Sequence, residues 1–406
     1  MRTFAVTSLL LYALALHTSM AGMEIFGWIL FLLGLLSVFV VKKNRAFNLP
    51  LLKPAALYIG LCLLSIAITP SPEPFIKRIA DLTWIFVFWG VAQTLILVWS
   101  DDFEKKLKIL WIIALAAATL VGLYQFFSGY DFIRKTGDHL PQVGHYFRST
   151  GFFSLCLTFA YSMGISGFTL ALPSRRLHKA LPYLALGLAG LCIYNSMTRG
   201  AWISFLGTIV LLGLIFFKKL TWRQIGVAVV SLMVYMLLLT KSDGGAKRIE
   251  HLTPTQTDQA VSERFDVWRG YLSMFQDHPV LGVGYDNGPA HLLEAYQKLG
   301  MDQDFVSHAH NDYLQALAET GIVGLLAFLF LLGSVFWKAY CLMPYRPDWA
   351  ISLMAGQLYV SIGSLSQANF TDAEVNHFTI FNWALVSTLT WIYTRSSHSK
   401  GSETLS

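Results

Sequence analysis

Charged residues are scarce in this chain. Of its 406 residues only 13% are Asp, Glu, Lys or Arg, whereas 55% are hydrophobic. A soluble domain carries about 25% charged and about 45–50% apolar residues, so both departures indicate a protein that faces lipid. The composition excludes a soluble enzyme, a disordered chain and a collagen-like rod. The net charge of +6 forms no basic block, which argues against a nucleic-acid partner.

Cysteine pairs and nucleotide-binding motifs are absent as well. The chain has no G-x-x-x-x-G-K-[ST] loop, so ATP hydrolysis is unsupported. Gly282-x-Gly284 follows a predicted helix and not a strand, which argues against a dinucleotide fingerprint. Neither a disulfide framework nor a zinc site is predicted, because the four cysteines lie within or beside apolar runs and have no C-x-x-C spacing: Cys62, Cys156, Cys192 and Cys341.

Long apolar runs dominate the sequence instead. A helix needs about 20 mostly apolar residues to cross the hydrocarbon core of a membrane. The sequence therefore predicts an all-α, polytopic membrane protein with about twelve transmembrane helices. Arg2 and the small residues around Ala21 give the first run some features of a cleavable signal peptide, but the eleven other runs favour a retained helix. The twelve runs are 4–21, 24–41, 54–69, 84–99, 109–127, 150–173, 180–197, 201–217, 225–240, 314–337, 349–367 and 377–394.

Basic residues in the connections predict the orientation of these helices. With the N-terminus in the cytoplasm, the inner connections hold 18 of the 30 Lys and Arg residues, and the short outer connections hold six. Short loops on the cytoplasmic side are enriched in Lys and Arg. We therefore expect both termini on the cytoplasmic side.

One long polar segment interrupts the apolar runs. It divides the chain into residues 1–240 with nine spans, an outer loop over 241–313, and residues 314–406 with three spans and a short tail. Loops of this length are uncommon unless they are functional. Apolar residues at three- and four-residue steps predict an amphipathic helix over 261–275. We expect a second helix over 289–299 and a third that begins near His308.

Polar side chains are densest just before the tenth span, in Ser307-His-Ala-His-Asn-Asp312. Histidine titrates near neutral pH and can accept a proton from a hydroxyl group. The alternatives are two interfacial histidines that cap a helix, or a zinc site. On a helix, His308 and His310 would point about 200° apart, which disfavours chelation by both. We therefore predict no metal site, with only one histidine facing a given pocket.

Two arginines are further candidates. Arg199 lies between two apolar runs, where a charge is costly unless it is paired or hydrated; the alternative is an anchor at the lipid headgroups. Gly200 is expected to allow a tight reversal there. Arg264 lies four residues before Trp268 on the same predicted helix face, and its guanidinium suits two phosphate oxygens at once. A solvated helix face is the alternative for Arg264, and Arg269 is expected to point elsewhere.

The remaining outer connections give weaker signals. Arg148 is a lesser candidate for the site. Asp372 and Glu374, near His377, could bind sugar hydroxyls, but a plain solvated loop is the preferred interpretation. No pair of carboxylates stands out in an outer loop as an acid–base couple.

Three motifs, in order, resemble the bacterial O-antigen ligase family, which shares its core with Wzy-type O-antigen polymerases. The resemblance is strongest over about residues 190–330, and the earlier spans match only in number and hydropathy. The motifs are Ser196-Met-Thr-Arg-Gly-Ala-Trp202; Ser262-Glu-Arg-Phe-x-x-Trp268 with Asp277-His-Pro-Val-Leu-Gly-Val-Gly-Tyr285; and Ser307-His-Ala-His-Asn-Asp-Tyr-Leu-Gln315 with Glu319-Thr-Gly-Ile-Val-Gly324.

The resemblance implies a chemistry. Such ligases move a glycan from undecaprenyl pyrophosphate to a sugar hydroxyl of lipid A–core, at the periplasmic face of the bacterial inner membrane, without nucleotide or metal cofactor. His310 would be the general base, Arg199 and Arg264 would hold the pyrophosphate, and the anomeric carbon would invert. Membrane lipids are further partners, and no nucleic acid is expected. The substrate-binding candidates are His308, Asn311, Trp268, Arg269 and Arg148.

Three rival functions remain open. A Wzy-type polymerase would join one lipid-linked glycan to another with nearly the same chemistry. A protein O-glycan ligase tends to carry extra soluble sequence at its C-terminus, and only about a dozen residues follow Arg395. A small-solute transporter should show charged or broken helices at the membrane midplane and inverted repeats, which the sequence does not suggest.

Glycan transfer is expected to continue in EDTA and to need no added nucleotide. The missing phosphate-binding loop and the poor chelating geometry predicted for His308 and His310 are the reasons. The measurement is transfer by purified protein before and after chelation. Loss of activity with EDTA, restored by zinc or magnesium, would contradict the prediction.

Overall fold

The fold is known from a computed structural model, which describes residues 1–41, 48–71, 75–134, 139–170, 180–216 and 259–403. Over these residues the chain is 76% helical, and the prediction of an all-α membrane protein is confirmed. One short antiparallel pair of strands occurs among them, between β1 (Gln142–Val143) and β2 (Tyr146–Phe147).

The helices follow the predicted apolar runs. Eleven of the twelve runs coincide with described helices, and the run 225–240 lies outside the described residues. The described helices are α1 (Arg2–Thr18), α2 (Met20–Val41), α3 (Leu52–Ile68), α4 (Phe75–Ala80), the 3-10 turn η1 (Asp81–Thr83), α5 (Trp84–Val98), α6 (Asp101–Ser128), α7 (Cys156–Thr169), α8 (Leu181–Asn195), α9 (Arg199–Ile215), α12 (Gln259–Asp277), α13 (Gly288–Lys298), α14 (Asp312–Tyr340), α15 (Pro347–Gly363) and α16 (Ala373–Glu403).

Four helical stretches of the described chain are long and apolar enough to cross a membrane by length and composition. Helices α3, α8 and α9 are apolar but shorter. The four stretches are Met20–Phe39, Phe75–Val98, Asp101–Ser128 and Asp312–Tyr340.

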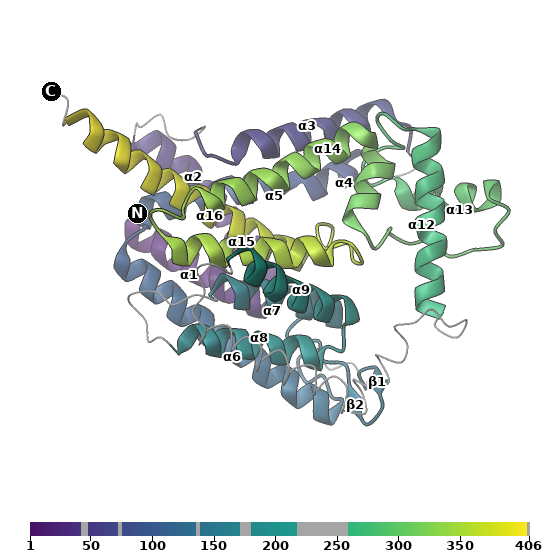
Figure 1. Ribbon diagram of the computed structural model, residues 1–406, viewed down its shortest axis with the longest axis horizontal. Coiled ribbons are helices and arrows are strands. Elements are labelled where there is room, and N and C mark those ends of the chain that lie inside the picture. Colours follow the sequence, from purple (N-terminus) through teal and green to yellow (C-terminus); the bar gives the residue numbers. More distant parts are fainter. Residues whose placement is uncertain (42–47, 72–74, 135–138, 171–179, 217–258, 404–406) are drawn as a thin grey trace.

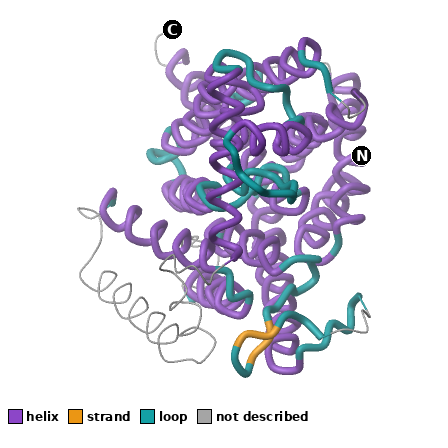
Figure 2. The backbone as a smooth tube through the Cα atoms, turned by 90° about the vertical axis from the view of Figure 1, so that its right-hand side faces the viewer, coloured by secondary structure: helices purple, strands orange, loops and turns teal. Residues whose placement is uncertain are grey.

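The amphipathic helices stand apart from the apolar bundle. Helix α12 lies across one end of the bundle and α13 lies beyond it, whereas both termini lie at the opposite end (Figure 1). Figure 2 looks onto the end that carries α12 and the two strands. The two helices predicted over 261–275 and 289–299 are present as α12 and α13. The third predicted helix is present as α14 and continues into the apolar run, but it begins at Asp312 and not near His308.

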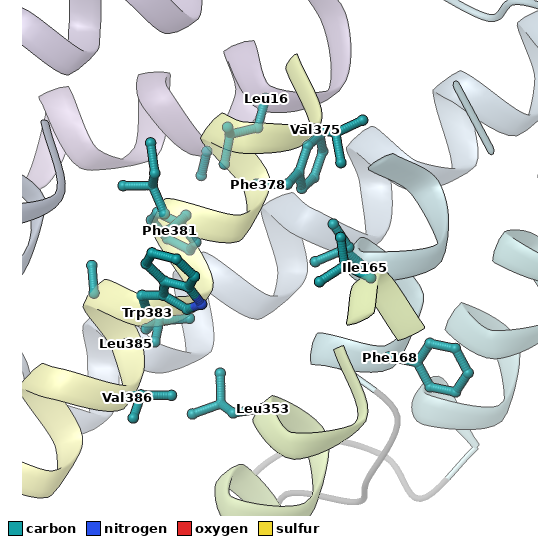
Figure 3. Packing of buried hydrophobic residues seen from close by; sticks show 14 of the residues in the cluster. Leu16, Ile165, Phe168, Leu353, Val375, Phe378, Phe381, Trp383, Leu385 and Val386 are labelled. Carbon is teal, nitrogen blue, oxygen red and sulfur yellow. The ribbon is translucent and has the colours of Figure 1, made fainter. Parts of the chain in front are cut away.

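The core of the bundle surrounds the first half of α16. Val375, Phe378, Trp383 and Leu385 are almost completely buried. Figure 3 shows them packed with residues of α7 and α15. Polar side chains of this half of α16 are buried together with the apolar ones, so neighbouring helices enclose it on all sides. The indole nitrogen of Trp383 donates a 2.6 Å hydrogen bond to Gln357, so this buried polar group of the core is satisfied.

Helix α14 breaks at Gly321, in its first third. The backbone there has φ 66° and ψ −171°, a conformation essentially restricted to glycine. The break frees carbonyl groups that accept from the segment after α12, with Val283 N–H donating to Ala318 (3.0 Å) and Gly284 N–H to Glu319 (2.8 Å). The Ile322 N–H donates in return to Pro279 (2.9 Å). The loop that follows α12 is therefore bonded to the bundle through the break.

Gly321→Ala is expected to destabilise the protein by about 1–3 kcal/mol. A β-carbon at this position would lie 2.1 Å from the Val280 carbonyl oxygen, and the backbone conformation is unfavourable for alanine. Thermal unfolding of the purified protein in detergent measures the effect. Gly333→Ala on the same helix is the matched control, because a β-carbon there would meet no neighbouring atom within 4 Å. Equal melting temperatures for the two variants would contradict this account.

Candidate active site

The histidine segment, residues 307–311, is an extended loop that α12 holds in place. The indole N–H of Trp268 donates to the Ala309 carbonyl at 2.7 Å, and the Tyr271 hydroxyl donates to the Ser307 carbonyl at 3.2 Å. Ala309 is fully buried in the small core formed by α12 and α13. The loop ends in a left-handed residue, His310, with φ 47°. Few non-glycine residues adopt this conformation, so the surrounding contacts hold it in place.

Asn311 starts α14 by capping it. Its side-chain oxygen accepts from the backbone N–H groups of Tyr313 and Leu314, both at 3.0 Å. These are donors that the first turn of a helix leaves without a partner. The side-chain amide donates to the Leu365 carbonyl at 3.1 Å. These contacts of Asn311 fix where α14 begins and join it to the connection after α15. Its role in substrate binding stays a prediction.

Asp312 joins the histidine segment to the connection between α15 and α16. Its backbone N–H donates to the Ser364 carbonyl (2.9 Å), and its buried carboxylate accepts from the backbone N–H groups of Asn369 (3.0 Å) and Phe370 (3.3 Å). Sequence reasoning missed this connection as part of the site. The sequence of this connection shows no functional pattern, because its residues bond to Asp312 through their backbone groups and not through their side chains.

The carboxylates after this connection are not solvated. Glu374 is 9% exposed, and Asp372 accepts from the Thr158 hydroxyl at 2.5 Å. Burial raises the pKa of Asp372 to about 6. The interpretation of this stretch as a plain solvated loop is therefore wrong, because the start of α16 packs against α7.

The imidazole of His310 is the half-buried titratable group of the histidine segment. Its Nε2 lies 3.1 Å from the Ser307 hydroxyl. Burial and, secondarily, the positive charge of Arg264 place the pKa of His310 below its ordinary value. The imidazole is therefore held neutral and able to accept a proton at neutral pH. His308 is exposed, so the two histidines have different surroundings even though they are not on a helix.

The segments that carry the two arginine candidates lie near each other. Arg264 is partly buried on α12, and its charge acts on both His310 and the hydroxyl of Tyr161. That hydroxyl lies against Gly200, where a β-carbon would meet it at 2.8 Å. Arg199, the neighbour of Gly200, begins α9. The structure thus brings together the three segments that the motifs singled out.

The turn before α9 differs from the prediction for Gly200. The chain reverses over Ser196–Thr198, with Met197 at φ 51°, and Gly200 already lies in the first helical turn. Its missing side chain makes room for Tyr161 and for the Ser366 hydroxyl, which a β-carbon would meet at 2.6 Å. The glycine therefore serves close packing beside Arg199 and not the reversal.

Residues 184–329 match the family model described as O-Antigen ligase. This match confirms the resemblance drawn from the three motifs, all of which lie within it. The match, together with the apolar helices, supports a membrane protein with ligase- or polymerase-type activity in the O-antigen pathway. No curated protein matches the chain.

The other predicted residues of this ligase-type site differ in their contacts. Arg148 donates from Nε to the Ser196 carbonyl at 3.2 Å and so supports the turn before α9. Arg269 is 70% exposed and lies 3.8 Å from Asp266, pointing into solvent as expected for its helix face. Neither contact tests a role in binding substrate.

A pair of carboxylates also lies near the histidine segment, although the sequence shows no such pair. Asp286, at φ 55°, and Asp81 are close enough for their charges to interact, and the charge of His308 acts on both. Burial first, and then Asp81, raise the pKa of Asp286. The two carboxylates come from segments far apart in sequence, which is why no local pattern reveals them.

The part of the chain that the structure describes holds no cluster of metal ligands. Within it, no three His, Cys, Asp or Glu side chains are grouped so that they could hold a metal ion. The helix on which the chelation argument rested is not formed at His308–His310. Metal independence thus stays a prediction, to be tested with a chelator.

Proposed function

We propose that this protein is an O-antigen ligase that transfers a glycan from undecaprenyl pyrophosphate to a hydroxyl group of lipid A–core, at the periplasmic face of the inner membrane. The observation that carries the proposal is the neutral, half-buried imidazole of His310, placed beside Arg264 where the three motif segments meet. Both termini lie at the far end of the bundle, in agreement with a cytoplasmic location (Figure 1).

In the proposed reaction, His310 acts as general base. Its Nε2 accepts the proton of the acceptor hydroxyl as that oxygen bonds to the anomeric carbon of the donor glycan. The bond between the anomeric carbon and the pyrophosphate oxygen breaks on the opposite face, so the configuration inverts. The electron pair of that bond leaves with undecaprenyl pyrophosphate, and the imidazolium later gives its proton to water. A base with a pKa below its ordinary value remains available for this step at neutral pH.

Arg199 and Arg264 would stabilise the leaving group. A pyrophosphate gains negative charge as the glycosidic bond breaks, and a guanidinium can meet two of its oxygens at once. The positive charge of Arg264 has a second effect, because it also disfavours protonation of His310. One residue would thus favour both the departure of the anion and the neutral state of the base.

A Wzy-type polymerase is the alternative, since the family supports either activity. The lipopolysaccharide pattern of a deletion strain separates the two. A ligase defect removes all long chains from the core and leaves lipid-linked polymer to accumulate. A polymerase defect leaves core that carries a single repeat, and that result would replace the ligase proposal.

His310→Ala is expected to reduce transfer by about 10²–10⁴-fold, the usual contribution of a general base, while the protein stays folded and binds the lipid donor. His308→Ala, at the exposed neighbouring histidine, is the matched control and should lose much less. Initial rates with purified protein, together with donor binding, measure the effect. An inactive His308→Ala with a nearly normal His310→Ala would reverse the assignment.

Arg199→Lys and Arg264→Lys are each expected to lose roughly 10- to 150-fold in binding or rate, because each charge-assisted contact contributes about 1.5–3 kcal/mol. Lysine keeps the charge but loses the planar fork that meets two phosphate oxygens. Arg269→Ala, on the solvent face of α12, should be tolerated better. Donor titrations with each variant measure the loss. Full activity in both lysine variants would argue against a shared pyrophosphate site.

A further inference from the structure

Gln367 is a buried side chain in the connection between α15 and α16, which reaches the α12 end of the bundle (Figure 1). It is 7% exposed, and its side-chain oxygen is buried without a hydrogen-bond partner. The Nδ1 atom of His310 is likewise buried without a partner. Buried polar atoms left in this way are costly, so an acceptor and a donor that lie close together in one site are expected to satisfy each other.

Gln367 does lie beside the imidazole. Its side chain interacts with His310 in the direction that raises the pKa of the ring, against the opposing effects of burial, Arg264 and His308. A neutral amide has this effect when its oxygen accepts from a ring N–H, because that bond favours the protonated imidazole. This direction is compatible with a bond between the two buried atoms that have no other partner, the Gln367 side-chain oxygen and Nδ1 of His310.

Backbone bonds on both sides of Gln367 fix its position relative to His310. Asp312 holds the Ser364 carbonyl before it and the Asn369 N–H after it, and Asn311 holds the Leu365 carbonyl. These two residues directly follow His310 in the chain. The connection cannot shift without moving the histidine segment. The backbone at Gln367 therefore keeps its position relative to the backbone at His310.

We propose that Gln367 is a positioning residue for the transfer reaction, whose side-chain oxygen accepts a hydrogen bond from Nδ1 of His310 and so directs the unprotonated Nε2 towards the acceptor hydroxyl. This inference rests on the proposed function of His310. In this tautomer the Ser307 hydroxyl, which lies 3.1 Å from Nε2, is the donor to it in the resting site. The acceptor hydroxyl takes that place during reaction, and the Gln367 oxygen stabilises the imidazolium that forms.

The groups that face His310 determine the direction of the pH effect. Arg264 on α12 and His308 in the same loop disfavour its protonation. The carboxylate of Asp312 is engaged by two backbone N–H groups of the connection. Replacing Gln367 by glutamate adds an anion beside the ring, whereas leucine removes the acceptor. The two substitutions should thus move the protonation of the base in opposite directions.

The test is the pH–rate profile of purified transfer for Gln367→Glu and Gln367→Leu. Because the neutral imidazole is the active form, activity falls as the pH drops through the pKa of His310. We expect Gln367→Glu to move this acidic limb to a pH about 1 higher. Gln367→Leu should move it lower and reduce the maximal rate on the order of 10-fold. Gln297→Glu, which adds the same charge on the exposed side of α13, is the control and should leave the limb in place.

Unshifted limbs in both Gln367 variants, with His310→Ala inactive, would overturn the positioning role and leave the proposed function intact. An active His310→Ala would instead overturn the proposed function itself. If the leucine variant does not fold, the nearly isosteric glutamate variant decides. If Gln367→Glu folds and the acidic limb of its pH–rate profile lies at the same pH as in the unsubstituted protein, the inference is contradicted.

Discussion

The buried carboxylate of Asp312 is the contact on which the site depends. Burying a carboxylate costs free energy unless hydrogen bonds compensate, and here two backbone N–H groups of the connection between α15 and α16 provide them. Asp312 is also the first residue of α14 and directly follows the Asn311 cap, so these bonds hold the connection against the end of the histidine loop. These bonds, with that of Asn311 to the Leu365 carbonyl, join the segment of Gln367 to that of His310.

A second constraint is the break in α14. In a membrane an unsatisfied backbone carbonyl is costly, so a helix can break only where other groups satisfy the freed carbonyls. The segment after α12 does so through Val283 and Gly284. The break therefore anchors the amphipathic helices to the bundle, and α12 in turn holds the backbone on either side of His308.

The charges at this end of the bundle have complementary roles. Arg264 acts on His310, and the carboxylates of Asp81 and Asp286 interact with His308. The half-buried histidine thus lies next to positive charge and the exposed one next to negative charge. In the proposed mechanism, His310 is the neutral base near the pyrophosphate. His308 belongs to a more polar surface, where a sugar acceptor can approach.

Much of the fold was available from the sequence, because hydropathy and helical periodicity are local properties. They predicted the apolar helices and, closely, the bounds of α12 and α13. The order of three motifs indicated the similarity to O-antigen ligases and the candidate site residues. The start of α14, by contrast, depended on the Asn311 cap and on the left-handed backbone of His310, which tertiary contacts hold. The role of Gly200 depended on Tyr161, a residue of another helix. The pairing of Asp81 with Asp286, and the approach of Gln367 to His310, were decided only by the tertiary structure, since bonds and charges between distant segments leave no periodic signal in the chain.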